Sequence, residues 1–348
     1  MPPGPIRLLL VEDSPVALAI LQRILKTAPD IEVVGVARNG EEALAMIPTV
    51  KPSLICTDLH MPKMNGLELT EEVMARFPCP ILVVSASVQE DDAQTVFRIL
   101  EAGALDIFPK PRTGLASEYE QARAGLLAKI RVLAGVSVFT HRRRPATEGG
   151  TALPRVSAPG GQLSRPRVLA LGASTGGPQT LLAILQQLPK TFPLPILCVQ
   201  HISDGFLQGL VDWLDSSCAL GVRLAVAGDL PQPGVVYFPP ERHHLEINAQ
   251  GQIALSSGGP VAGHCPSVTV LFKSVAAYYR QAAVGVLLTG MGRDGADGLQ
   301  AMAQAGGLTV AQDEESCVVF GMPREAIALG AAQHVLPLGE IPTFVLKR

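Results

Sequence analysis

The sequence predicts two α/β units, each built on a largely parallel sheet with helices on both faces, and three observations support this prediction. Short apolar runs alternate with amphipathic segments over residues 6–133, and a second alternation starts at Val168. Residues 136–166 interrupt the pattern with four prolines and two Gly-Gly pairs, which is typical of a linker. A chain of 348 residues also favours two domains over one. We therefore expect domains over residues 1–135 and 167–348, joined by the linker 136–166.

The first domain is predicted to consist of five strand–helix pairs. Five short apolar segments predict strands: Ile6–Val11, Ile31–Ala37, Ser53–Thr57, Ile81–Val84 and Asp106–Phe108. Five amphipathic segments predict helices: Pro15–Lys26, Gly40–Ile47, Leu67–Phe77, Glu90–Leu100 and Ser117–Leu133. Strands that alternate with helices form parallel sheets covered on both faces. We therefore expect a five-stranded parallel (βα)5 domain, with ligands bound at the carboxyl ends of its strands.

Polar side chains stand just beyond four of these five strands. Glu12 and Asp13 follow the first strand, Asp58 the third, Ser85 the fourth and Lys110 the fifth. Converging carboxylates repel one another unless a cation binds between them, and Mg2+ prefers such oxygen ligands. A lysine and a hydroxyl nearby would stabilise a phosphoryl group carried by one of the carboxylates. The simpler alternative is that Asp13 or Ser14 only caps the next helix, but a set of five polar residues at strand ends favours a site.

This pattern resembles the receiver domain of response regulators. The matching segments are Val11-Glu12-Asp13-Ser14, Asp58-Leu59-His60-Met61-Pro62-x-Met64-x-Gly66-Leu67-Glu68, Ser85-Ala86 and Lys110-Pro111. The resemblance implies that Asp58 is the phosphoacceptor and that Ser85 and Lys110 contact the phosphoryl oxygens. It implies a histidine kinase as the phosphodonor.

The resemblance also implies a Mg2+ site in this domain. Glu12, Asp13, Asp58 and the backbone carbonyl of His60 would hold the ion. Two positions depart from the usual receiver pattern, because Glu12 stands where Asp is more usual and Asn65 where Asp is common. Neither departure removes the acceptor carboxylate.

The second domain opens with a strand, a glycine-rich turn and a helix between Val168 and Leu188. The pattern Gly172-x-Ser174-x-Gly176 fits the nucleophile elbow, in which small residues allow a sharp turn that exposes the serine hydroxyl. The N-terminus of the following helix suits an oxyanion or a phosphate equally well. From this stretch alone, a structural turn or a nucleotide site stays open as an alternative, because a nucleophile needs a base elsewhere in the chain.

The rest of the second domain alternates in the same way. Further strands are predicted at Ile196–Val199, Val222–Val226, Val235–Phe238, His244–Ile247, Gln252–Leu255, Val284–Leu288 and Leu308–Ala311. Helices are predicted at Phe206–Leu214, Val268–Tyr279, Ala296–Ala303 and Arg324–Leu329. We expect a doubly wound, mostly parallel sheet, with a small antiparallel excursion formed by the three short strands between residues 235 and 255.

Three polar residues stand just past predicted strands of this domain: Ser174, His201 and Asp294. A serine hydroxyl needs a base to take its proton, and the base needs a third group to fix its tautomer. A doubly wound sheet brings the ends of its strands together, so these three residues are candidates for a triad. Their order, Ser, His and Asp, differs from the Ser, Asp, His order of α/β-hydrolases.

Two other histidines, His264 and His334, are rivals of His201 for the role of the base. His264 starts a predicted helix and is a candidate for the wall of the site, whereas His334 precedes an apolar run and is expected to be structural. His243 and His244 lie in the region of the antiparallel excursion and are expected to face solvent.

Several longer motifs resemble the catalytic domain of the CheB family. They are Gly172-Ala173-Ser174-Thr175-Gly176-Gly177, Gln200-His201, Gly263-His264-x-Pro266-Ser267-Val268, Leu288-Thr289-Gly290-Met291-Gly292-x-Asp294-Gly295 and Gln312-Asp313-Glu314-x-Ser316-Cys317-Val318-Val319-x-Gly321-Met322-Pro323. The resemblance implies that Ser174 is the nucleophile, His201 the base and Asp294 its partner. The backbone of the Thr175 region and of Met291 would face the oxyanion.

Members of this family are chemotaxis-type protein-glutamate methylesterases that also deamidate glutamine. The resemblance therefore implies a cytoplasmic, phosphorylation-activated hydrolase that acts on the cytoplasmic helices of methyl-accepting chemoreceptors and uses a cognate chemotaxis-type histidine kinase. It also implies that the unphosphorylated receiver obstructs the cleft at Ser174, and that the catalytic domain needs no cofactor. Residues 202–207 depart from the common Met-Pro continuation, which leaves the particular receptor and pathway open.

Composition, charge and sequence patterns argue against several other classes of function. The formal charge of −3 gives no electrostatic reason to expect nucleic-acid binding or an anionic membrane surface, and no apolar run approaches the length of a membrane span. The N-terminus lacks the pattern of a signal peptide, and the six scattered cysteines suggest reduced thiols. If the second domain were a nucleotide-binding module, an acidic residue that binds the ribose would be expected after its second strand. The chain has His201 at that position. A DNA-binding output would need a helix-turn-helix pattern that the C-terminus lacks.

Overall fold

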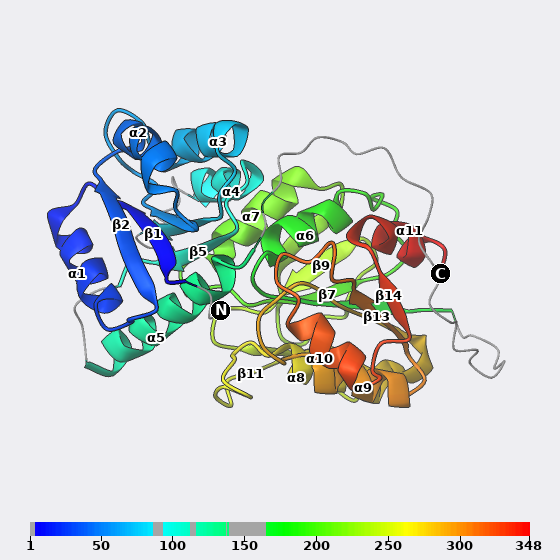
Figure 1. The fold of residues 1–348 in the computed structure, drawn as a ribbon. Helices are drawn as coiled ribbons and strands as arrows, with labels where there is room; N and C mark the ends of the chain where they lie inside the picture. The colour runs from blue at the N-terminus through cyan, green and yellow to red at the C-terminus, as the bar shows by residue number, and fades with distance from the viewer. Residues whose placement is uncertain (1–3, 86–92, 112–115, 137, 139–164) are drawn as a thin grey trace. The chain divides into compact units, whose positions relative to one another are not determined.

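The structure, a computed structural model, describes residues 4–85, 93–111, 116–136, 138 and 165–348. The chain divides into two compact units (Figure 1). The first unit comprises Met1–Phe139 and Ile202–Ser216, and the second comprises Thr140–His201 and Ser217–Arg348. Most of the predicted linker and the first residues of the helix predicted at Glu90 lie outside the described residues. None of the described helices is both long enough and apolar enough to cross a membrane.

The first unit contains a five-stranded parallel sheet in the order β2-β1-β3-β4-β5. Its strands are β1 (Ile6–Val11), β2 (Ile31–Ala37), β3 (Leu54–Thr57), β4 (Ile81–Ser85) and β5 (Asp106–Pro109). Every residue of β3 and β4 is buried, as expected for inner strands of a sheet that helices cover on both faces. The fold class predicted for the first domain is confirmed, and its first two strands have the predicted ends.

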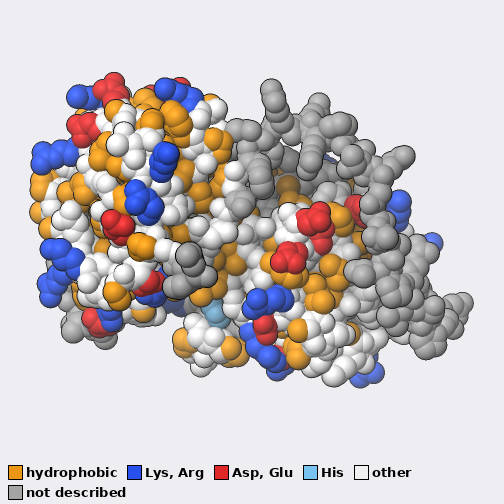
Figure 2. Space-filling model, viewed as in Figure 1, with side chains coloured by type: hydrophobic (Ala, Val, Ile, Leu, Met, Phe, Trp, Pro, Cys, Tyr) orange, Lys and Arg blue, Asp and Glu red, His pale blue; other side chains and the backbone are white. Residues whose placement is uncertain are grey.

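Side-chain caps fix where the helices of this unit begin. The helices are α1 (Pro15–Leu25), α2 (Gly40–Val50), α3 (Gly66–Arg76), α4 (Ala93–Glu101) and α5 (Ala116–Leu133). Ser14 caps α1 by accepting a hydrogen bond from Ala17 N at 3.3 Å, and Asn65 and Glu68 form a capping box at α3. Ser14 rather than Asp13 is therefore the cap of α1. On the face of the molecule in Figure 2, acidic and basic side chains are interspersed over this unit rather than gathered by sign.

The second unit contains a seven-stranded parallel sheet in the order β14-β13-β12-β6-β7-β9-β8. Its strands are β6 (Val168–Ala173), β7 (Ile196–Gln200), β8 (Gly221–Leu224), β9 (Val235–Phe238), β12 (Ala283–Leu287), β13 (Leu308–Gln312) and β14 (His334–Leu336). A separate antiparallel pair is formed by β10 (His244–Ile247) and β11 (Ile253–Ser256). The mostly parallel fold with a small antiparallel part is confirmed. The assignment of Val235–Phe238 to the antiparallel part is wrong, because β9 pairs in parallel with β7 and β8.

The strand order of this sheet reverses beside β6. The chain adds β7, β9 and β8 on one side of β6, and β12, β13 and β14 on the other. In such sheets, ligands bind at the carboxyl ends of the strands where the order reverses. Ser174 follows β6 directly, and Asp294 lies between β12 and α9 (Ala296–Gln304). The topology therefore places both residues at this point of the sheet.

Helices of the second unit pack large apolar side chains against the sheet. The helices are α6 (Gly177–Leu185), α8 (Val268–Tyr279), α9, α10 (Met322–Ala328) and α11 (Ile341–Leu346), while α7 (Leu207–Ser217) lies almost wholly in the first unit. Leu271, Phe272, Leu299 and Met302 of α8 and α9 are fully buried in the core of the second unit. Burial of each such side chain contributes about 1.5–3 kcal/mol. This packing holds the N-terminus of α8 firmly in place at the edge of the sheet.

Candidate functional sites

Three carboxylates meet at the carboxyl edge of the first sheet. Glu12 and Asp13 follow β1, Asp58 follows β3, and each residue has a carboxylate oxygen within 4.8 Å of the others. The three meet because β1 and β3 are neighbours in the sheet. Glu12 and Asp58 are buried, whereas Asp13 is exposed. The cluster is therefore open to solvent on the Asp13 side.

Lys110, which follows β5, reaches into this cluster. Its Nζ donates to Asp58 Oδ2 at 2.7 Å and to Glu12 Oε1 at 2.9 Å. Burial alone would lower the pKa of Lys110, but the hydrogen bonds and charges of the two carboxylates raise it above its usual value. Burial raises the pKa of Glu12, and the charge of Asp58 adds to this rise, which Lys110 only partly opposes. One positive charge thus faces three carboxylates, so the cluster favours a further cation.

The donor set of the cluster fits a hard divalent cation. Glu12 Oε2 is buried and has no hydrogen-bond partner in the described part of the chain. A buried oxygen without a partner costs free energy, which a bound cation would recover. Mg2+ takes carboxylate oxygens as ligands and keeps several waters, which the exposed Asp13 side can accommodate. The structure therefore brings Glu12, Asp13 and Asp58 together in an arrangement that suits Mg2+.

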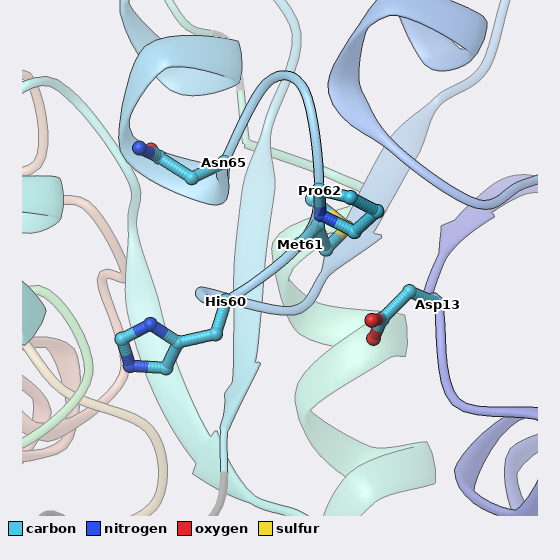
Figure 3. A pocket seen from close by; sticks show the side chains of 5 residues that line it. All are labelled: Asp13, His60, Met61, Pro62 and Asn65. Atoms are coloured by element: carbon cyan, nitrogen blue, oxygen red, sulfur yellow. The ribbon is translucent and has the colours of Figure 1, made fainter.

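A cavity of about 570 Å³ opens beside the acidic cluster. Asp13 from the β1–α1 loop lines it together with His60, Met61, Pro62 and Asn65 from the β3–α3 loop (Figure 3). Ser85, at the end of β4, is buried, and its backbone oxygen accepts a hydrogen bond from Lys110 N at 2.7 Å. The five strand-end residues predicted from the sequence thus all lie at the carboxyl edge of the first sheet.

Ser174 occupies a sharp turn between β6 and α6. Its backbone N–H donates to Thr289 O at 3.0 Å, and its carbonyl accepts from Gly177 N at 2.8 Å. Gly176 has a φ of 74°, a left-handed conformation that glycine adopts without strain. A Cβ at this position would also lie 2.5 Å from Val318 Cβ. The turn therefore requires glycine, and it leaves Ser174 partly exposed.

His201 directly follows β7 and pairs with Asp294. Its Nε2 lies 2.9 Å from Asp294 Oδ2. The backbone N–H of His201 donates to Ala173 O at 3.0 Å, so His201 lies beside the residue that precedes Ser174. The structure therefore brings Ser174, His201 and Asp294 to the same edge of the second sheet.

The carboxylate of Asp294 is buried at the N-terminus of α8. It accepts hydrogen bonds from Ser267 Oγ at 2.8 Å, Val268 N at 2.7 Å, Thr269 N at 3.0 Å and Gly295 N at 2.9 Å. Burial alone would raise the pKa of Asp294, but the hydrogen bond and charge of His201, with the hydrogen bonds from Thr269, hold it well below its usual range. A helix N-terminus stabilises a negative charge further. Asp294 is thus an ionised, fixed partner for the His201 ring.

The other ring nitrogen of His201 faces a different environment. His201 Nδ1 is buried and makes no hydrogen bond to any described residue. In serine triads, the nitrogen that does not face the carboxylate takes the proton of the nucleophile. With Nε2 on Asp294, Nδ1 is the nitrogen available for that step. The nitrogen that faces the carboxylate is therefore Nε2 here, whereas in the chymotrypsin triad it is Nδ1.

His264 packs against the ring of His201. The two ring centroids are 4.0 Å apart, and the ring planes differ by 2°. Burial, and then the charge of His201, lower the pKa of His264 below its usual value. His264 therefore favours the neutral form, in which it can stack on His201 without charge repulsion.

Among the described residues, the backbone N–H groups without an acceptor near Ser174 include those of Thr175 and Met291. Thr175 lies in the turn before α6, and Met291 lies in the loop after β12. The Thr289 O to Ser174 N hydrogen bond joins these two segments. Such N–H groups can bind a developing oxyanion.

One expectation about the histidines is wrong. His244, expected to face solvent, is 2% exposed, because β10 packs against α8. Its Nδ1 accepts a hydrogen bond from Ser267 N at 3.1 Å, and its Nε2 lies 2.9 Å from Gly259 O. His244 thus supports Ser267, which in turn bonds Asp294. His334 lies on the edge strand β14, where its ring packs against Phe344.

Most of the residues that support these sites carry no clear signal in the sequence. Ser267, Thr289 and Gln312 are fully buried and hydrogen-bonded at or next to the candidate catalytic residues. For Ser267 a signal existed, since a serine directly before an apolar helix is typical of an N-cap. No comparable signal marks Thr289 or Gln312, because their roles depend on contacts between distant segments.

Comparison with known proteins connects this geometry to a family. The sequence model described as CheB methylesterase matches residues 169–345, and that of the response regulator receiver domain matches residues 8–116. The chain is 44% identical to protein-glutamate methylesterase/protein-glutamine glutaminase 1 of Syntrophus aciditrophicus (strain SB), and the match covers 98% of both chains. It is 43% identical to a protein-glutamate methylesterase/protein-glutamine glutaminase of Nitrosospira multiformis, over 97% of this chain and 95% of the relative.

A solved structure gives the same result for the second unit. The methylesterase catalytic domain of CheB from Thermotoga maritima superposes with a TM-score of 0.51 and 38% sequence identity. The match covers 53% of this chain and 99% of that one. From its matches along the whole chain, this protein belongs to the CheB methylesterase family and carries a response regulator receiver domain before its catalytic domain.

Proposed function

We propose that the chain is a phosphorylation-activated protein-glutamate methylesterase and protein-glutamine glutaminase. Its substrates would be the cytoplasmic helices of methyl-accepting chemoreceptors, and its phosphodonor a chemotaxis-type histidine kinase. The names of the full-length relatives support this activity. The observation that carries the chemistry is the His201 ring, which has Nε2 on a buried carboxylate and a buried Nδ1 that no described residue hydrogen-bonds.

The proposed reaction proceeds in two steps. Ser174 Oγ attacks the ester carbonyl while its proton moves to His201 Nδ1, and the Thr175 and Met291 N–H groups stabilise the oxyanion. Collapse of the tetrahedral intermediate breaks the C–O bond, and His201 returns the proton to methanol as it leaves. Water then attacks the acyl-enzyme with His201 as base, which yields glutamate and restores Ser174. With glutamine as substrate, the first leaving group is ammonia.

Asp294 would stabilise the imidazolium that forms on His201 in both steps. Its ionised carboxylate is held by hydrogen bonds from Ser267, Val268, Thr269 and Gly295, so it stays in position while the charge of His201 changes. A preorganised charge of this kind costs no reorganisation at the moment of reaction.

In the receiver domain we infer that Asp58 accepts the phosphoryl group. Glu12, Asp13, Asp58 and the backbone carbonyl of His60 would hold Mg2+, which when bound neutralises charge as the anionic donor approaches. Lys110, at 2.7 Å from Asp58 Oδ2, is placed to contact a phosphoryl oxygen, and Ser85 lies at the end of the adjacent strand. The active protein would reside in the cytoplasm, where receptor helices and kinase are accessible.

Methanol release from a methylated receptor preparation tests the catalytic part of this proposal. Ser174→Ala should lower the turnover number by roughly 1,000-fold or more, because triad members act as a unit. Ser257→Ala, which removes a hydroxyl from an exposed loop, is the matched control and should keep wild-type turnover. Turnover in folded Ser174→Ala close to that of Ser257→Ala would rule out Ser174 as the nucleophile.

A further inference from the structure

The loop after β12 contains a buried hydroxyl that bonds the turn carrying Ser174. We propose that the hydroxyl of Thr289 is a positioning group that sets the spacing between the two backbone N–H groups facing the oxyanion. This inference rests on the proposed function, because it assigns Thr289 a role in the reaction at Ser174. Thr289 itself touches neither substrate nor the reacting atoms.

The first observation is the set of contacts around Thr289 Oγ1. The residue is 0% exposed. Its Oγ1 lies 3.0 Å from Thr175 O and 3.3 Å from Val319 O, and it accepts a hydrogen bond from Val319 N at 2.9 Å. A hydroxyl has a single proton to donate, and the shorter contact favours Thr175 O as its acceptor. One oxygen thus joins the turn at Ser174 to the segment around Val319.

The backbone of Thr289 strengthens the same connection. Its carbonyl accepts from Ser174 N at 3.0 Å, and its N–H donates to the buried side-chain oxygen of Gln312 at 2.9 Å. Gln312 is held in turn, because its Nε2 donates to Ser316 O at 2.8 Å. Thr289 therefore bonds both Ser174 and Thr175 while being fixed from the side opposite to them.

Gly290, the next residue, has no hydrogen-bonding capacity left for substrate. Its N–H donates to Val319 O at 3.0 Å, and its carbonyl accepts from Gly321 N at 3.1 Å and Met322 N at 2.9 Å. A Cβ at Gly290 would lie 2.7 Å from Ser174 Cβ, so the two backbones are in close contact here. The next N–H along the chain, that of Met291, donates to no atom of the described residues. At least one N–H without a described acceptor therefore lies on each side of the contact that the Thr289 hydroxyl holds.

The physical consequence is a defined spacing of donors. Oxyanion donors act only if they lie at hydrogen-bond distance from the position that the oxyanion reaches, and a displacement of about 1 Å can cost roughly 100-fold in rate. Loss of the Thr289 hydroxyl leaves Thr175 O and Val319 N without their partner. The turn and the loop can then shift relative to each other. Such a shift weakens binding of the transition state more than binding of the substrate.

The test compares variants of Thr289 in the full-length protein. Thr289→Val keeps the shape but removes the hydroxyl, and it should lower kcat by roughly 10- to 100-fold with KM changed by less than about threefold. Thr289→Ser restores the hydroxyl and should bring kcat back to within about threefold of wild type. Thr309→Val is the matched control. Thr309 is 0% exposed and lies on β13, and its hydroxyl accepts a hydrogen bond from Gln333 N at 3.1 Å. It should leave kcat unchanged.

Each outcome bears on the positioning role. The inference is overturned if Thr289→Val keeps wild-type kcat, if Thr289→Ser loses as much kcat as Thr289→Val, or if only KM changes. If urea unfolding shows that Thr289→Val is not folded, Thr289→Cys replaces it, because a thiol is a weaker donor of similar size. The kcat of Thr289→Cys should lie below that of Thr289→Ser but above the value expected without any donor. Wild-type kcat in Thr289→Cys would also overturn it. Ser174→Ala in the same assay separates the positioning role of Thr289 from the proposed function. Wild-type turnover in Ser174→Ala would refute the proposed function, whereas the Thr289 variants test only the positioning role.

Discussion

The two ring nitrogens of His201 differ because of where the neighbouring residues lie. Asp294 faces Nε2 and is held ionised by the N-terminus of α8, while Nδ1 is buried and has no partner among the residues that the structure describes. The sequence identifies His201 and Asp294 as residues of suitable chemistry just past strands. It cannot show which nitrogen faces the carboxylate, because that depends on the side-chain rotamer and on the backbone of α8. For the same reason it shows His264 only as a residue near the site.

The stack of His264 on His201 leads to a pH-dependent prediction. The folded-state pKa of His264 is lowered, so the unfolded chain binds a proton at a higher pH than the folded chain. Folding stability should therefore fall as pH drops from the unfolded pKa, about 6.5, through the lower folded value. His264→Phe keeps an aromatic ring against His201 but removes this titration. Its unfolding free energy should fall less than that of the wild type between pH 8 and pH 5.

Urea unfolding at several pH values measures this difference directly. His201 and Asp294 also face His264, and both are present in wild type and variant, so the comparison isolates the imidazole of His264. His243→Phe, in a loop of the same unit, is the control and should follow the wild-type pH dependence. Parallel stability curves for wild type and His264→Phe would contradict a lowered pKa at His264.

At the scale of elements, the alternation of apolar and amphipathic segments predicts most of both sheets. The strand ends in the first unit differ from the predicted ones by at most one residue. The errors occur where short segments depend on distant partners. Val235–Phe238 is an unbroken apolar run, typical of a parallel strand buried on both faces, yet its nearness in sequence to β10 and β11 favours a hairpin assignment. The three-residue strand β14 is too short to show any periodicity.

The close approach of α6 to β7 gives a prediction at this scale. A Cβ at Gly177 would lie 1.8 Å from Gln200 Oε1 and 2.9 Å from Ala173 Cβ. Gln200 Nε2 donates to Ser174 O at 2.7 Å and to His201 O at 2.8 Å, so displacing Gln200 disturbs both residues. Gly177→Ala should lower the unfolding free energy by about 1–3 kcal/mol, despite the better helix propensity of alanine. It should also lower esterase turnover.

Chemical denaturation and methanol release on the same preparation check both effects. Gly258→Ala is the control, because no described atom beyond its two chain neighbours lies within 4 Å of a Cβ at that position. This control should keep both the stability and the turnover of the wild type. A stable and fully active Gly177→Ala would show that Gln200 can move without disturbing the turn at Ser174.

At the scale of the whole molecule, the chain carries two sites with unrelated chemistry. One is an acidic cluster with a lysine at the edge of the first sheet, and the other joins a serine, a histidine and a carboxylate at the edge of the second. Each sheet places its own site by the same rule, since both sites lie at the carboxyl ends of parallel strands. The sequence predicts each site separately because each depends on its own domain. The effect of the acidic cluster at Asp58 on turnover at Ser174 depends on both domains, so the full-length protein is the one to assay.

Phosphorylation of Asp58 should therefore change turnover at Ser174 through a shift between two states of the chain. Coupling free energies of about 1–3 kcal/mol are typical, so a small phosphodonor with Mg2+ should raise methanol release from methylated receptor roughly 5- to 150-fold. Asp58→Asn removes the acceptor and should hold turnover at the unstimulated level. Asp30→Asn is the matched control, since Asp30 pairs with Arg131 on the surface of the same unit and should leave the response intact. Stimulation of Asp58→Asn equal to that of Asp30→Asn would place the acceptor elsewhere. An unstimulated wild type with labelled Asp58 would show that the two sites act independently.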